Sequence, residues 1–161
     1  MNKTMMTDFY EFTMAQTYFD QGKQDEMAYF DIFFRSNPFN GGYLMTGGLG
    51  ETIEYINNFK FEDEDINYLR KTGCFNDSFL EYLKDLKFSG DIYAMPDGTA
   101  AFPNEPVLTV RANMVEAQIL ETALLTNFNH GSLVTTKAKR ITAEAPGIPV
   151  MEFGARRARG I

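Results

Sequence analysis

The residues best suited to bind a small anion lie close together near the end of the sequence. Residues 148–153 are typical of a buried strand, and Gly154 and the adjacent arginines Arg156 and Arg157 follow them. A guanidinium group grips a carboxylate or a phosphate with two hydrogen bonds, and the ring of Phe153 can stack on a flat heterocycle. Ligands usually bind at the carboxyl ends of parallel strands. Residue types alone favour a ligand site and a surface arginine pair equally.

A second candidate for phosphate binding is the glycine-rich segment Gly47-Gly48-Leu49-Gly50, which precedes a predicted helix. Free backbone amides at a helix N-terminus can bind anions. The segment lacks both the dinucleotide-binding fingerprint and the Gly-Lys-Ser/Thr ending of a P-loop. A tight turn is therefore the favoured interpretation.

Several other kinds of site are excluded by the residues present. The sequence contains no Gly-x-Ser-x-Gly, His-Glu-x-x-His or Cys-x-x-Cys motif. Cys74 is the only cysteine and His130 the only histidine, so we expect no disulfide and no metal site. His130 stands among turn residues, where a capping or packing role is favoured over catalysis.

Composition and charge limit the partners. The chain has 22 acidic residues against 15 lysines and arginines, a net charge of −7, which opposes general binding to nucleic acid. Its start lacks the pattern of a signal peptide, and no run reaches the roughly 18 apolar residues of a membrane helix. We therefore expect a cytoplasmic protein that binds neither nucleic acid nor a membrane.

The first element that could position a ligand is a helix between Thr7 and Gly22 with two apolar rows. Its first row is typical of a core face. Its second row consists of Tyr10, Met14 and Tyr18 at a spacing of four residues. This row faces either the core, which periodicity alone favours, or a partner subunit or ligand.

The remaining pattern predicts an α/β fold with an α+β front domain, residues 1–112, and the beginning of a second α/β domain, residues 113–161. The turn Asn40-Gly41-Gly42 suggests that a strand over 26–35 pairs with residues 43–46. Gly131-Ser132 is expected to separate two helices. The other expected elements are helices over 63–71, 77–87, 114–128 and 132–145, and strands over 92–94, 100–102, 107–110 and 148–153.

Five blocks of this sequence resemble the nicotinate phosphoribosyltransferase family, and they occur in the family's order. Together they cover essentially the whole chain, although each block alone would be weak. They are TDFYEFTM at residues 7–14, FFR and PFNGGY within 33–43, FPNEP at 102–106, the segment 129–140, and EFGARRA at 152–158.

The resemblance implies a type II phosphoribosyltransferase architecture, in which a barrel-like α/β domain follows the front domain. It implies that nicotinate and phosphoribosyl pyrophosphate give nicotinate mononucleotide and pyrophosphate, coupled to ATP hydrolysis and with Mg²⁺ on the pyrophosphate. It also implies a homodimer with shared active sites. Family members continue well beyond 161 residues, and their phosphorylated histidine lies in that continuation. We therefore expect no catalytic residue here and no activity from this chain alone.

By the same resemblance, Tyr10 reaches the nicotinate pocket of the other subunit, Phe153 stacks on the pyridine ring, and Arg156 and Arg157 hold carboxylate or phosphate. Lys137 and Arg140 are weaker phosphate candidates, and their three-residue spacing places them on one face of a helix.

Two alternatives stay open. One is a related transferase for nicotinamide or quinolinate, although the block at residues 152–157 favours nicotinate. The other is a non-catalytic, truncated chain that acts as an interaction module through exposed apolar helix faces.

Overall fold

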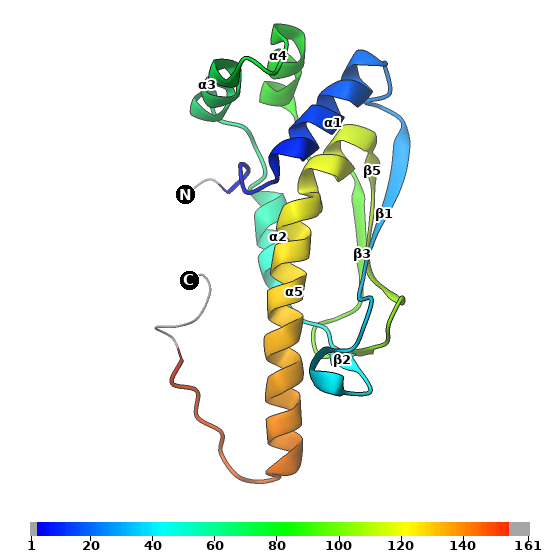
Figure 1. The fold of residues 1–161 in the computed structure, drawn as a ribbon, viewed down its shortest axis with the longest axis vertical. Helices are drawn as coiled ribbons and strands as arrows, with labels where there is room; N and C mark the ends of the chain where they lie inside the picture. Colours follow the sequence, from blue (N-terminus) through cyan, green and yellow to red (C-terminus); the bar gives the residue numbers. More distant parts are fainter. Residues whose placement is uncertain (1–2, 155–161) are drawn as a thin grey trace.

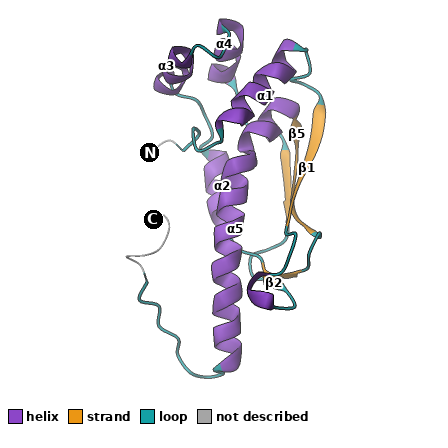
Figure 2. Ribbon diagram, viewed as in Figure 1, coloured by secondary structure: helices purple, strands orange, loops and turns teal. Residues whose placement is uncertain are grey.

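The computed structural model describes residues 3–154 and combines one long helix, four shorter ones and two small sheets (Figure 1). Figure 2 shows the helices gathered on one side of the longer strands. The elements, in chain order, are α1 (Phe9–Asp20), β1 (Met27–Phe33), a 3-10 turn (Pro38–Asn40), β2 (Leu44–Met45), α2 (Leu49–Asn57), α3 (Asp63–Thr72), α4 (Asp77–Asp85), β3 (Asp91–Ala94), β4 (Ala100–Ala101), β5 (Pro106–Asn113) and α5 (Met114–Glu144).

The larger sheet is antiparallel, with strand order β1-β5-β3. Residues alternate between its faces, as a half-buried strand requires. Ile32 on β1 and Leu108 and Val110 on β5 are buried, whereas Tyr29 and Tyr93 are exposed. The buried face packs against α5, which also contacts α1 and α2.

The expected pairing of the first strand with residues 43–46 is wrong. β1 pairs with β5 instead, from Met27 opposite Asn113 to Phe33 opposite Pro106, and β2 pairs with β4. After β1 the chain turns away through a 3-10 turn in which Phe39 and Asn40 both have positive φ, 59° and 52°. This turn leads β2 away from the edge of β1, so the Asn-Gly-Gly segment closes no hairpin.

The expected break at Gly131-Ser132 is also wrong, because α5 is one helix of 31 residues. A Cβ atom on Gly131 would lie 2.6 Å from the carbonyl carbon of Gly47 and 2.6 Å from the nitrogen of Gly48. The glycine therefore permits a close backbone crossing rather than ending the helix. Ser132 caps no helix. It is fully buried and accepts a hydrogen bond from the Gly47 amide at 3.1 Å.

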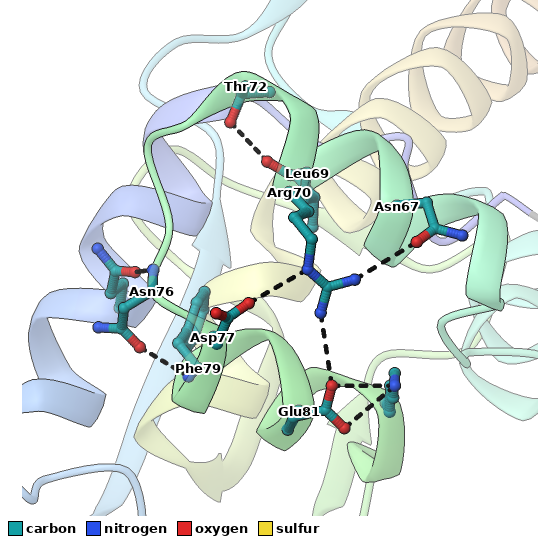
Figure 3. A network of polar contacts seen from close by, with 10 residues as sticks. Asn67, Leu69, Arg70, Thr72, Asn76, Asp77, Phe79 and Glu81 are labelled. Carbon is teal, nitrogen blue, oxygen red and sulfur yellow. Dashed lines mark hydrogen bonds and ion pairs between the residues drawn. The ribbon is translucent and has the colours of Figure 1, made fainter.

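The predicted acidic helices are confirmed as α3 and α4, and one arginine connects them. Figure 3 shows Arg70 donating to Asp77 and Asn67, and to Glu81 at 3.5 Å. The Asn76 side chain caps α4 by accepting from the Phe79 amide at 2.8 Å. These exposed contacts fix the corner between the two helices beside α1.

The expected strand over residues 148–153 does not form; these residues adopt no helix or strand after α5. Val150 and Met151 are exposed by 50% and 73%. Among the described residues, no strand pairs with this segment to satisfy its backbone groups. The proposed boundary between residues 112 and 113 stays a prediction, and the first half of α5 packs on the sheet of the front part.

Candidate functional site

Helix α1 presents Tyr10 on its outer face. Its inner face buries the apolar Phe12 and Ala15 and one charged residue, Glu11. Tyr10 and Met14 follow the same helical period on the other side and are exposed by 48% and 38%. In the Tyr10 row, Tyr10 and Met14 therefore lie at the surface, whereas Tyr18 is partly buried against the core. Such a surface is available to a ligand or a second subunit.

Beneath Tyr10 lies a polar cluster between α1 and α5, which we call the Glu11 cluster: Tyr10, Glu11, Gln118, Glu121 and Thr122. Gln118 Nε2 donates a short hydrogen bond to Glu11 and a longer one, 3.4 Å, to Glu121. The Tyr10 hydroxyl donates to Glu121 at 3.5 Å, and the Thr122 hydroxyl donates to Glu11 at 3.5 Å. Glu11 is fully buried.

The electrostatics of the Glu11 cluster follow from two carboxylates that share neutral donors. Within residues 3–154, no ion pair involves Glu11 or Glu121. Burial and the charge of Glu11 raise the pKa of Glu121. The neighbouring Glu11 carboxylate has the largest effect on the Tyr10 phenol, and together with burial and the charges of Glu121 and Asp8 it raises the pKa of that phenol. Tyr10 is therefore a neutral donor throughout the physiological range.

No local motif indicates this cluster, and reasoning from the residues alone missed Glu11, Gln118 and Glu121. The available signal was that polar residues interrupt the apolar stripes of two helices that pack together. Polar groups buried at a helix crossing must find partners in each other. A contact between α1 and α5 was needed to identify those partners.

The two weaker phosphate candidates on α5 have different surroundings. Lys137 is exposed. The Arg140 guanidinium turns toward the 3-10 turn, where its Nη2 donates to the carbonyl oxygens of Pro38 and Tyr43, both at 3.2 Å. It also lies over the rings of Phe39 and Tyr43, at 5.5 and 5.8 Å. Arg140 therefore has a structural function in holding residues 38–43.

An open groove of about 1460 Å³ runs between α2, α5 and the first residues, and Gly47, Gly48 and His130 line it. His130 lies within α5 and not at a corner between two helices. At the N-terminus of α2, the Leu49 amide donates to the Asp97 carboxylate at 3.1 Å. Because an acidic side chain already takes this position, a phosphate there would be repelled. The tight turn is confirmed, with Gly48 at φ 101°.

The structure does not bring the remaining candidates together with Tyr10. Phe153 is 80% exposed. Arg156 and Arg157 lie outside the described residues, so their roles stay predictions. Among residues 3–154 no cluster of three or more acidic, histidine or cysteine side chains could hold a metal ion, and no helix is long and apolar enough to cross a bilayer.

With this geometry established, comparison with known proteins gives the family. Residues 5–129 match the nicotinate phosphoribosyltransferase N-terminal domain. The chain belongs to the nicotinate phosphoribosyltransferase family. The family resemblance inferred from the five sequence blocks is thereby confirmed.

Two bacterial relatives show how far the sequence similarity extends. A nicotinate phosphoribosyltransferase of Mycobacterium tuberculosis is 44% identical over 156 residues, which are 97% of this chain and 34% of the relative. The enzyme of Bacillus subtilis is 44% identical over 155 residues, 96% of this chain and 32% of the relative.

The crystal structure of human nicotinic acid phosphoribosyltransferase superposes with a TM-score of 0.86 at 34% identity, over 96% of this chain and 32% of that one. The predicted mixed helix and strand fold is therefore confirmed for the amino-terminal portion of the family. The chain spans about a third of the length of these relatives.

Proposed function

We propose that this chain is the amino-terminal portion of an enzyme that transfers a phosphoribosyl group from phosphoribosyl pyrophosphate to nicotinate. The observation that carries the proposal is the combination of 44% identity over 97% of the chain with a fold that matches the human enzyme at a TM-score of 0.86. The products are nicotinate mononucleotide and pyrophosphate, and the reaction consumes ATP. The enzyme acts in the cytoplasm and binds neither nucleic acid nor a membrane.

The chemistry of this transfer assigns tasks to the candidate residues. Displacement at the sugar carbon develops positive charge there while pyrophosphate departs, so the protein must orient the pyridine nitrogen and stabilise the leaving anion. Phe153 stacks on the pyridine ring, and Arg156 and Arg157 bind its carboxylate or a phosphate. Mg²⁺ arrives bound to the pyrophosphate.

Tyr10 belongs to the active site of the second subunit in a homodimer. Its position on the outer face of α1 supports this assignment, because a residue that serves a partner must be exposed in the isolated chain. Exposed Phe9 and Met14 on the same helix supply apolar area for the contact, with 46% and 38% of their surfaces accessible. Lys137 extends from α5 as a further phosphate contact. Arg140 is a less favourable candidate, because its guanidinium already holds residues 38–43.

The proposal is tested by measuring nicotinate mononucleotide formed from nicotinate, phosphoribosyl pyrophosphate, ATP and Mg²⁺. The complete gene product that contains residues 1–161 is expected to be active, and residues 1–161 alone are expected to be inactive because the family's catalytic histidine lies outside them. Clear turnover by the isolated chain would contradict the second expectation. A complete product that is folded and inactive would contradict the first.

The rival substrates are separated by thermal-shift titration of the complete gene product with nicotinate, nicotinamide and quinolinate. Nicotinate should raise the melting temperature most, since at equal concentration the ligand that binds the folded state more tightly stabilises it more. A larger shift with nicotinamide or quinolinate would replace nicotinate as the substrate. Sedimentation tests the non-catalytic alternative: an interaction module associates without binding any of the three pyridines.

A further inference from the structure

Two hydrogen bonds beside the Glu11 cluster join the start of α1 to α5. Thr7 Oγ1 donates to the carbonyl of Ile119 at 3.2 Å, and the Asp8 amide donates to Thr122 Oγ1 at 3.2 Å. These two bonds fix the beginning of α1 on α5. The Tyr10 hydroxyl then donates to Glu121, which belongs to the same part of α5. The residues just before α1 and the hydroxyl of Tyr10 are thus held by the same turn of α5.

The cluster is also anchored from below. Glu11 is fully buried and Gln118 is 2% exposed, so neither can exchange its partners for water at low cost. Gln118 bridges the two carboxylates with one amide nitrogen. Glu121 therefore stands between a buried, immobile partner and the half-exposed phenol of Tyr10.

We propose that Glu121, supported by Gln118 and Glu11, is a positioning residue that holds the Tyr10 ring in one orientation on the outer face of α1. This inference rests on the proposed function in one respect: it takes the Tyr10 ring to be the one that contacts a planar pyridine ligand. An exposed tyrosine without such a bond would sample several rotamers and lose that freedom on binding. Fixing it beforehand removes this cost from the binding step.

The charged and titratable groups around Glu121 come from two elements, α1 with its N-cap and β1. Asp8, Tyr10 and Glu11 face it from α1 and its N-cap, and Asp31 of β1 lines with it a small cavity of about 170 Å³. None of them is a cation. A side chain at position 121 that accepts a hydrogen bond without charge should therefore keep the Tyr10 contact, and one that cannot accept should lose it.

The first test is spectroscopic and uses residues 1–161 with ¹³C-labelled tyrosine. The Tyr10 ring signals, assigned by their loss in Tyr10→Phe, are expected to shift with pH as Glu121 titrates. Glu121→Gln should reduce this titration and keep the signals sharp, whereas Glu121→Ala should shift them toward those of a freely rotating ring. Glu144→Ala, an exposed acid on the same helix, is the control. Unchanged Tyr10 signals in Glu121→Ala overturn the positioning role.

The second test measures KM for nicotinate in the complete gene product. Glu121→Ala and Tyr10→Phe should each raise KM about threefold to tenfold, with kcat little changed, because each removes one hydrogen bond to the same ring. The double variant should be no worse than either single one, and Glu121→Gln should stay within about twofold of wild type. Independent, multiplying effects would overturn the proposal. If wild type uses no nicotinate, the proposed function fails, and the spectra alone still decide whether Glu121 positions Tyr10.

Discussion

The crossing of α5 over the Gly47-Gly48 segment is expected to tolerate no side chain at position 131. In Gly131→Ala the new Cβ would meet two backbone atoms, each at 2.6 Å, where carbon atoms in contact are normally separated by about 3.5–4 Å. Backbone on both sides leaves no flexible side chain to move aside. The helix and the segment must therefore separate by about 1 Å to restore that contact distance.

That separation has a calculable cost. It stretches the bond from the Gly47 amide to Ser132, now 3.1 Å, and the bond from the Met45 amide to Thr136, now 2.8 Å. Overpacking costs about 1–3 kcal/mol, and each weakened buried hydrogen bond costs about 1 kcal/mol more. Against these stands a gain of about 1 kcal/mol, because alanine is the better helix former. The net expectation is a loss of about 2–4 kcal/mol in the free energy of unfolding.

Urea unfolding followed by circular dichroism measures this loss, with Gly50→Ala as the matched control. Gly50 lies inside α2, and a Cβ atom there would meet nothing within 4 Å. The same substitution should therefore stabilise the protein at position 50, by about 0.5–1 kcal/mol, and destabilise it at position 131. If Gly131→Ala equals or exceeds wild type in stability, the close crossing does not exist in solution.

Three further predictions concern buried polar groups. Glu116→Ala should lower the free energy of unfolding by about 1–3 kcal/mol, measured by urea unfolding, because the Ser89 amide and hydroxyl each lose a 2.8 Å bond; Glu116→Gln should cost less. Arg140→Ala should speed hydrogen exchange in residues 38–43, because it removes the bonds to the Pro38 and Tyr43 carbonyls, and Arg140→Lys should be intermediate. Unchanged exchange would show that Arg140 does not hold these residues. Burial raises the pKa of Tyr55, so the folded state keeps its proton and stability is lost as pH rises above about 10. Tyr55→Phe should reduce that alkaline loss in a melting series, and exposed Tyr68→Phe should not.

Local patterns predicted most elements correctly and failed where a distant segment decided the outcome. The helix at Phe9–Asp20 and the strand at Met27–Phe33 agree with their periodicity. The wrong hairpin arose because a turn motif specifies a reversal but not the strand that becomes the partner. The wrong helix break at Gly131 arose because a glycine that ends a helix and one that admits a crossing backbone look alike without the other segment.

In the candidate site too, the sequence indicated the residue types but not the contacts that those residues make. The sequence showed the row that contains Tyr10, but periodicity alone favoured the core for it, and the exposure of Tyr10 is known only from the structure. The engagement of Arg140 with the turn at residues 38–43 joins positions about a hundred residues apart and has no local signal. Residues 148–153 have the composition of a strand but form none in the structure. A strand also requires a neighbouring strand to bond its backbone N–H and C=O groups, and the local sequence pattern does not show whether one is present.

Helix α5 connects the surroundings of Tyr10 with the turn at residues 38–43 and the glycine-rich segment at residues 47–50. Its first half holds the start of α1 and thereby Tyr10, through Gln118, Glu121 and Thr122. Its second half holds the aromatic turn through Arg140 and the glycine segment through Ser132. A helix 31 residues long is about 46 Å from end to end, so an unbroken α5 keeps these distant groups in one rigid arrangement. If the helix broke at Gly131, the turn could move independently of Tyr10. Because α5 is unbroken, the chain holds both Tyr10 and the turn at residues 38–43 in fixed positions.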